Sequence, residues 1–361
     1  MVINIKTVRD DRYRFVHTMD LDSGFYYRTG IFDQFGHETD QDPFMAQYPH
    51  LLDVGIMGHC VHGKSGLCLK AGVQCYQDGL HKEEPNMSVD DFQMIMDQSR
   101  GKLHQVALGG RGDPDMHEDF EAIVASARTV DIVPNLTTSG FGLTKENVKI
   151  MKRYCGAVAV SWYRSSYTLQ SIDMLLSYGI KTNIHYVLGN NSIDEAIAIL
   201  ENDSLPEGIN RIIFLLHKPV GLGTQDQVLQ ISDPKVAYFF SLFQNESIID
   251  RAGFDSCTVP GLINHDTVIH EGSLDTCEAA RFSAYIAPDM MMTPCSFDQE
   301  YKWGISLREY SIQDAWEHKK FNDFRNTLQR SCPYCSKRAS CLGGCPIKKE
   351  IVLCKTLQEG N

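Results

Sequence analysis

Short apolar runs alternate with amphipathic stretches between residues 52 and 216. After the first run they recur roughly every 25 to 29 residues, which is the length of a strand, a helix and two turns. The six runs are Leu52–Met57, Gln105–Leu108, Ile132–Asn135, Ala157–Ser161, Thr182–Leu188 and Arg211–Leu216. Repeated strand–helix units predict an α/β fold with a parallel sheet and right-handed crossovers.

Helix starts can be recognised between these runs. Ser88-x-x-Asp91 precedes a stretch with apolar residues on one face, and Ser192-x-x-Glu195 has the spacing of a capping box. Six units are too few for a closed eight-stranded barrel, so the pattern predicts a partial (βα)6 barrel of the TIM type. A doubly wound sheet is the alternative. In both folds, ligands bind at the carboxyl ends of the strands.

The rest of the chain divides around this barrel, which we assign to residues 51–225. Residues 1–50 are polar and aromatic; we expect a hairpin around Asp20–Gly24 and assign the segment no role. Residues 226–270 have the pattern of a connector. Residues 271–361 form a small cysteine-rich domain.

Composition narrows the class of protein. The 361 residues are 43% hydrophobic and 22% charged, as in an ordinary globular protein, and no apolar run is long enough to span a membrane. The net charge of −12 argues against nucleic-acid binding. The first residues lack the apolar region of a secretory signal, so we expect a cytoplasmic protein. In that reducing compartment, cysteines are more often metal ligands than disulfides.

Ten of the twelve cysteines form two groups. Three follow the first strand: Cys60, Cys68 and Cys75. Seven lie in the tail: Cys277, Cys295, Cys332, Cys335, Cys341, Cys345 and Cys354. A metal site takes three or four thiolates, so these cysteines predict several sites. The upstream trio fits either a four-iron cluster with one open iron or a zinc site completed by His59 or His62.

Polar and glycine-rich segments follow the next predicted strands. Gly110-Arg-Gly-Asp-Pro114 comes after the second strand, Thr137-Thr-Ser-Gly140 after the third, and Ser161 ends the fourth. Glycines permit close approach of the backbone to a ligand, and Asp113 offers a carboxylate to a cation. An ordinary tight turn between strand and helix is the alternative interpretation of each segment.

This combination resembles the radical S-adenosylmethionine (SAM) enzymes. Their first strand leads into a cluster loop, and their second ends in a Gly-Glu-Pro motif, for which this chain has Asp113 in place of Glu. The resemblance implies that Cys60, Cys68 and Cys75 hold a [4Fe-4S] cluster whose open iron binds SAM. The residues that it implies as SAM contacts are Gly110, Gly112, Asp113, Thr138, Ser161 and Arg164. The cysteine spacing departs from the family, because Cys-x7-Cys-x6-Cys replaces Cys-x3-Cys-x2-Cys, and Gln74 replaces the usual aromatic residue.

The tail resembles the SPASM extension of peptide-modifying radical SAM enzymes, whose pattern of seven cysteines is complete here. The resemblance implies two auxiliary [4Fe-4S] clusters, and therefore three clusters in all. The first would be held by Cys277, Cys295 and Cys345, with Cys257 as a possible fourth ligand. The second would be held by Cys332, Cys335, Cys341 and Cys354. A zinc ribbon would account for four cysteines and leave three unexplained.

The function implied by this resemblance is reductive cleavage of SAM to a 5′-deoxyadenosyl radical, which abstracts a hydrogen from a ribosomally made peptide. Flavodoxin or ferredoxin would supply the electron. Oxidative cross-linking, through a thioether or a carbon–carbon bond, is the expected outcome. Epimerisation and side-chain oxidation of the sulfatase-maturation type are alternatives, and a non-catalytic iron–sulfur or zinc scaffold that binds a peptide is an alternative of another class. His185 and His217 are weak candidates for proton removal, because histidines in a core are more often structural.

Overall fold

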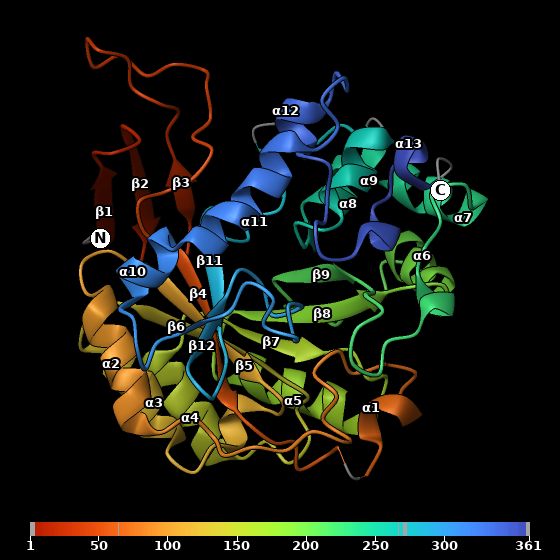
Figure 1. The fold of residues 1–361 in the computed structure, drawn as a ribbon. Helices are drawn as coiled ribbons and strands as arrows, with labels where there is room; N and C mark the ends of the chain where they lie inside the picture. Colours follow the sequence, from red (N-terminus) through yellow and green to blue (C-terminus); the bar gives the residue numbers. More distant parts are fainter. Residues whose placement is uncertain (1–3, 64, 266, 270–272, 359–361) are drawn as a thin grey trace.

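The computed structural model describes residues 4–63, 65–265, 267–269 and 273–358. Within them, ten strands form one sheet in the order β10-β9-β8-β7-β6-β5-β4-β11-β12-β13 (Figure 1). The six predicted runs are its parallel strands: β4 (Leu51–Met57), β5 (Gln105–Gly110), β6 (Val133–Thr138), β7 (Val158–Ser161), β8 (Thr182–Leu188) and β9 (Arg211–Leu216). The prediction of these strands is confirmed.

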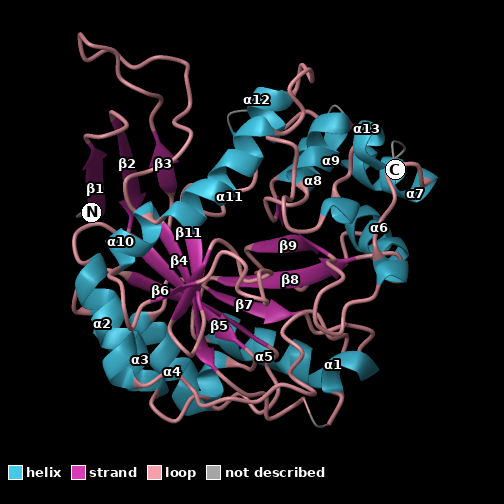
Figure 2. Cartoon of the chain, viewed as in Figure 1, coloured by secondary structure: helices cyan, strands magenta, loops and turns pink. Residues whose placement is uncertain are grey.

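Helices connect consecutive strands and cover one face of the sheet (Figure 2). They are α2 (Val89–Ser99), α3 (Phe120–Arg128), α4 (Lys145–Tyr154), α5 (Ser166–Ser177) and α6 (Ile193–Glu201). The order of the six strands follows the sequence without the reversal that defines a doubly wound sheet. The fold is therefore the partial (βα)6 barrel, and the doubly wound alternative is wrong.

One of the two predicted helix caps forms as expected. Ser88 accepts a hydrogen bond from the backbone N–H of Asp91 at 3.1 Å, at the start of α2. The capping box at Ser192 is wrong, because this side chain makes no cap hydrogen bond to α6. Its hydroxyl instead accepts from the N–H of Gly189 at 2.9 Å. Glu195 accepts hydrogen bonds from Arg164 and Tyr186, which hold it away from the helix start.

The N-terminal segment forms a separate antiparallel sheet of β1 (Ile5–Asp10), β2 (Phe15–Asp20) and β3 (Tyr26–Arg28). The expected hairpin at Asp20–Gly24 is present, closed by the Gly24 N–H to Asp20 carbonyl bond of 2.8 Å. This sheet packs against the amino ends of the barrel strands. Lys6 donates to the carbonyl of Leu103, just before β5, and Lys181, just before β8, donates to the carbonyl of Ser23. The segment therefore covers the end opposite to the cysteine loops.

The connector and the tail both extend the barrel sheet. β10 (Ala252–Phe254) pairs in parallel with β9, and β11 (Ser283–Ile286) pairs in parallel with β4. The connector thus contributes a strand, and the sheet runs on into the tail without a break. The predicted boundary at residues 270 and 271 lies outside the described residues.

The remaining elements are short. Those of the connector and tail are α7 (Pro234–Ser241), α8 (Glu246–Ile249), α9 (Val259–Asn264), β12 (Met291–Thr293), β13 (Ile305–Ser306), α10 (Ile312–Glu317), α11 (Lys319–Arg330), α12 (Arg338–Cys341) and α13 (Lys355–Gln358). The helix α1 (Leu67–Lys70) lies in the upstream cysteine loop. In the described parts of the chain, every helix is too short or too polar to cross a membrane.

The packing of the N-terminal sheet gives a first prediction. Phe15 is fully buried and its ring meets that of Phe282 edge-on at 6.5 Å, whereas Phe35 is 76% exposed. Phe15→Ala should lower the free energy of unfolding by about 3–5 kcal/mol, because a large cavity remains. Phe35→Ala should change it by no more than about 0.5 kcal/mol. Urea denaturation measures both, and equal effects would contradict the packing described.

Candidate functional site

The carboxyl ends of β4 and β5 approach each other closely. A Cβ atom on Gly112 would lie 2.6 Å from the carbonyl oxygen of His59 and 3.3 Å from Cα of Cys60. Gly110 has φ +114°, and a Cβ there would lie 2.5 Å from the carbonyl oxygen of Met57. Only glycine fits at these positions, because the backbone at the end of β4 occupies the space that a side chain would need. The neighbouring segment is the cysteine loop itself.

Asp113 links this turn to the end of β6 and to the cysteine loop. Its carboxylate accepts hydrogen bonds from the N–H of Ser139 at 2.8 Å and from the Ser139 hydroxyl at 2.5 Å. Nε2 of His62 lies 3.4 Å from the same carboxylate. The acidic residue of the turn therefore faces the three-cysteine loop, as expected for a group that meets a cation there.

Cys60, Cys68 and Cys75 come together although their spacing is long. Burial raises the pKa of Cys68 to about 11, and the nearby charges of Cys75 and Cys60 add to the shift. Burial also raises the pKa of Cys60, with Asp113 and Cys75 as further causes. The hydroxyl of Tyr163 lies 3.3 Å from Sγ of Cys68. These effects place the three thiols in one neighbourhood of the cysteine loop.

Hydrogen bonds from other strand ends fix the longer loop. Arg164 donates to the carbonyl of Ala71 at 2.9 Å, and the N–H of Leu222 donates to the carbonyl of Cys75 at 2.9 Å. The side-chain amide of Gln74 donates to the hydroxyl of Thr224 and accepts from the backbone N–H of Thr224, each at 2.9 Å. The residue that replaces the family's aromatic side chain thus binds the segment after β9.

Four of the tail cysteines influence one another electrostatically. Burial raises the pKa of Cys341, and the charges of Cys354, Cys332 and Cys335 raise it further. Burial likewise raises the pKa of Cys332, with Cys335 and Cys354 adding to the effect. These four are the cysteines for which the family resemblance implies the second auxiliary cluster, and that assignment stays a prediction.

Cys257 lies with the other group. Its hydrogen bond with Cys345, followed by burial, raises the pKa of Cys257 well above the usual range. Burial raises the pKa of Cys277, with the charges of Cys257 and Cys295 as further causes. Cys257 therefore neighbours the cysteines for which the sequence predicted a site with an optional fourth ligand, and its role as that ligand stays a prediction. The chemistry of these four thiols fits a four-iron cluster, in which each iron takes one thiolate.

A buried ion pair lies beside this second set of thiols. Lys218 is 7% exposed, and its Nζ binds Asp255 at 2.7 Å. Burial alone would lower the pKa of Lys218, but Asp255 and then Cys257 raise it above its usual value. Sequence reasoning missed both residues, because two oppositely charged side chains far apart in sequence carry no local signal of a contact.

Among the described residues, no group of three or more Cys, His, Asp or Glu side chains lies closely enough together to hold a single metal ion.

The remaining predicted SAM contacts lie around the same edge. The hydroxyl of Thr138 accepts from the N–H of Gly140 at 3.0 Å, and Ser161 pairs with His185 at the end of β7. Arg164 has φ +56° and forms an ion pair with Glu195. The guanidinium of Arg164 therefore already pairs with a protein carboxylate, whereas the Gly110–Asp113 turn faces the cysteine loop directly.

The two candidate bases are both engaged in structural contacts. Nδ1 of His185 lies 3.2 Å from the Thr137 hydroxyl, and burial lowers the pKa of His185 to about 4. Nε2 of His217 lies 3.0 Å from the carbonyl of Thr224, and burial lowers its pKa too. Both rings are neutral at pH 7, which fits the structural interpretation of these histidines.

A partial barrel with a cysteine loop after its first strand and two further thiol groups in a tail is the fold of radical SAM enzymes that carry a SPASM domain. Residues 277–341 match the SPASM family model, described as an iron–sulfur cluster-binding domain. The chain is 24% identical over 326 residues to the mycofactocin maturase MftC of Mycolicibacterium smegmatis, covering 78% of this chain and 76% of the relative.

Solved structures show the same fold. Streptococcus suis SuiB bound to its precursor peptide SuiA matches with a TM-score of 0.68 at 14% identity, over 98% of each chain. SuiB bound to SAM matches with a TM-score of 0.63 at 18% identity, over 87% of this chain and 78% of SuiB. The protein anSMEcpe with bound SAM matches with a TM-score of 0.60 at 16% identity, over 82% of this chain and 89% of that one.

The close approach of the Gly110–Asp113 turn can be tested with a matched pair of glycines on one strand and turn. Gly112→Ala places a Cβ against the cysteine loop, whereas a Cβ at Gly109 meets no atom within 4 Å. The added methyl group of Gly112→Ala should cost about 1–3 kcal/mol through overpacking. A cost of that size should weaken SAM binding about tenfold or more. Gly109→Ala should bind SAM as the unmodified chain does. Equilibrium binding of SAM to the reconstituted proteins checks this, and equal affinities would contradict it.

Proposed function

We propose that this chain is a radical SAM enzyme that modifies a ribosomally made peptide by oxidative cross-linking, in the cytoplasm. The observation that carries the proposal is the meeting of three thiols with the Gly110–Asp113 turn at the carboxyl edge of the barrel. The match of residues 277–341 to a cluster-binding domain supports it. A structure of SuiB with its precursor peptide and the relation to a maturase favour a peptide as substrate.

The chain's own groups fit the cofactors that the proposal needs. When bound, a [4Fe-4S] cluster and SAM supply an adenosyl radical that abstracts hydrogen from carbon. Cys60, Cys68 and Cys75 offer three thiolates to such a cluster and leave one iron for SAM. Gly110 and Gly112 let the turn pack against the backbone at the end of β4, and the carboxylate of Asp113 would be offered to the amine of SAM.

The two four-thiol groups favour a net oxidation. Four thiolates satisfy all irons of a [4Fe-4S] cluster and leave no position for the substrate. Such sites accept or pass electrons instead of binding the peptide. Cross-linking removes two hydrogens from the substrate and therefore needs an electron acceptor, whereas epimerisation does not. An external donor such as flavodoxin or ferredoxin would supply the electron that starts each turnover.

Two alternatives within the class are an epimerase and a side-chain oxidase of the sulfatase-maturation type. A scaffold without catalysis is the alternative of another class. It would account for the thiols, but it gives no reason for a glycine turn packed against the first cysteine. Formation of 5′-deoxyadenosine separates the enzyme from the scaffold.

The function is tested by anaerobic reconstitution. The unmodified chain should bind about twelve irons and form 5′-deoxyadenosine after reduction, because three four-iron sites are expected. Replacement of Cys60, Cys68 and Cys75 by Ala should leave about eight irons and abolish this product. Iron analysis and chromatography measure both. Bound zinc without SAM cleavage would refute the proposal.

Adding candidate peptides to the reconstituted protein shows which product the reaction forms. Synthetic peptides encoded by the short reading frames that flank this chain's gene serve as probes. A loss of two hydrogens by mass spectrometry, with a fragmentation pattern that joins two residues, supports cross-linking. An unchanged mass with an inverted stereocentre would favour epimerisation, and a loss of two hydrogens confined to one residue that gains a carbonyl group would favour side-chain oxidation.

The assignment of Cys257 as the fourth ligand has a matched control in Cys155. Burial raises the pKa of Cys155 to about 12, and the charge that acts on its thiol is that of Arg128 and not that of another cysteine. Cys257→Ala should lower the iron content by about one to four per chain, because the first auxiliary site loses a thiolate. Cys155→Ala should leave iron unchanged. Iron analysis with electron paramagnetic resonance checks this, and indistinguishable variants would refute the assignment.

A further inference from the structure

A tyrosine hydroxyl lies against one of the three upstream thiols. The Oη atom of Tyr163, just after β7, is 3.3 Å from Sγ of Cys68 on α1. A phenol keeps its proton at neutral pH, and a cysteine that ligates iron is a thiolate without a proton. With a cluster bound, the direction of this hydrogen bond is therefore fixed: the hydroxyl of Tyr163 donates and the sulfur of Cys68 accepts.

The chain on either side of Tyr163 is held by one carboxylate. Trp162 and Arg164 both donate to Glu195 on α6, through the indole N–H at 3.2 Å and through Nε of Arg164 at 2.5 Å. The backbone N–H of Trp162 also donates to the carbonyl of His185 at 2.9 Å, which extends the pairing of β7 with β8. Tyr163 lies between two anchored residues, so its backbone position is fixed.

The segment that carries the thiol is held from neighbouring strand ends. Arg164 donates to the carbonyl of Ala71 at 2.9 Å, and the side-chain amide of Asn191 donates to the carbonyl of Gly72 at 3.1 Å. Ala71 and Gly72 follow α1 directly, one turn after Cys68. These bonds fix the short helix of the thiol beside the segment of the hydroxyl.

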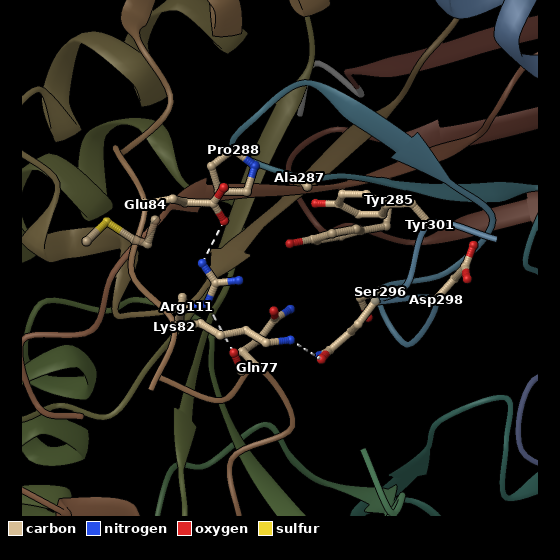
Figure 3. A pocket seen from close by; sticks show the side chains of 12 residues that line it. Gln77, Lys82, Glu84, Arg111, Tyr285, Ala287, Pro288, Ser296, Asp298 and Tyr301 are labelled. Atoms are coloured by element: carbon tan, nitrogen blue, oxygen red, sulfur yellow. Dashed lines mark hydrogen bonds and ion pairs between the residues drawn. The ribbon is translucent and has the colours of Figure 1, made fainter. Parts of the chain in front are cut away.

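The two ends of the cysteine loop are fixed by Arg111, on the turn after β5. Its guanidinium donates to the carbonyls of Gly58 and Gln77, which precede and follow the three cysteines, at 2.9 and 3.1 Å, and it pairs with Glu84 at 2.6 Å. Figure 3 shows Arg111 with Glu84 and Gln77 at the edge of a small pocket. The loop is thus anchored at its ends and in its middle, which keeps Cys68 next to the hydroxyl.

A hydrogen bond to a ligating sulfur changes how readily a cluster takes an electron. Reduction adds one negative charge, and part of that charge lies on the sulfur ligands. A donor that points at the sulfur stabilises the more negative state more strongly, and this raises the reduction potential. Removal of the donor leaves the oxidised state relatively more stable.

We propose that Tyr163 raises the reduction potential of the iron–sulfur cluster held by Cys60, Cys68 and Cys75, an inference that rests on the proposed function. One electron passes to this cluster from an external donor of the flavodoxin or ferredoxin class. No bond breaks and Tyr163 keeps its proton, so the only change is one added negative charge, which the hydrogen bond to Cys68 stabilises. Glu195 is a positioning residue, because it acts through the two residues that it holds.

The test removes or strengthens this one hydrogen bond. Tyr163→Phe deletes the hydroxyl and keeps the ring, whereas Tyr163→3-fluorotyrosine makes the hydroxyl more acidic and a stronger donor. Tyr301→Phe is the matched control, because the hydroxyl of Tyr301 donates to a carboxylate, that of Asp289, at 3.1 Å. After anaerobic reconstitution, a redox titration with electron paramagnetic resonance follows the part of the signal that changes when SAM is added. This part separates the upstream cluster from the two auxiliary ones.

Tyr163→Phe should keep about twelve irons per chain. At the midpoint potential of the unmodified chain, its ratio of reduced to oxidised cluster should fall about tenfold, which for one electron is a shift of about 59 mV to lower potential. Tyr163→3-fluorotyrosine should shift the midpoint to higher potential, because a stronger donor stabilises the reduced state further. Tyr301→Phe should leave the midpoint unchanged.

Equal midpoints in the unmodified chain and in Tyr163→Phe would overturn the inference, as would shifts of the same sign in the two Tyr163 variants. A loss of about four irons in Tyr163→Phe would mean that the hydroxyl holds the cluster instead of tuning it, and would also overturn the inference. An unmodified chain that binds iron but gives no signal responsive to SAM and no 5′-deoxyadenosine would refute the proposed function itself.

Discussion

Two backbone segments, residues 58–60 after β4 and residues 110–113 after β5, lie so close that a single methyl group would separate them. This contact depends on parallel strands that end at the same edge and on glycines that lack a Cβ. It brings the carboxylate of Asp113 to the loop that carries Cys60. The third strand end joins through Ser139, so one turn connects three strands at the mouth of the barrel. Arg164 and Thr224 then fix a cysteine loop that spacing alone would leave free.

The tail is positioned by strand pairing and not by its linker. β11 continues the sheet beside β4, with Tyr285 opposite Asp53. This pairing fixes the position at which the chain leaves β11 and continues into the cysteine-rich tail. Cys295 follows β12 closely and reaches the group that contains Cys257, which itself follows β10 at the other edge of the sheet. Cys257 and Cys295 thus come from segments on the two sides of the open barrel, and the charge of Cys257, after burial, raises the pKa of Cys295.

The sequence predicts those parts of the fold that repeat. Long apolar runs and the cap at Ser88 are local signals, and the structure has them where expected. Strands β10 and β11 were missed because three or four residues are too few for a period. The box at Ser192 failed because Arg164 and Tyr186 compete for Glu195, and that competition exists only in the folded chain. Cys257 could be named as a candidate from composition, but its neighbours depend on how the sheet closes.

The inner face of the barrel explains why one carboxylate differs from the others. Radical chemistry needs a site that excludes water, and exclusion of water disfavours every charged side chain inside it. His185 avoids this penalty because it is neutral, and Glu84 and Glu195 offset it because each pairs with an arginine at the rim. No described residue donates a hydrogen bond or an ion pair to Asp53, and burial raises its pKa to about 6. Burial without a partner disfavours the ionised carboxylate, so the folded chain holds a proton on Asp53 more tightly than the unfolded chain does.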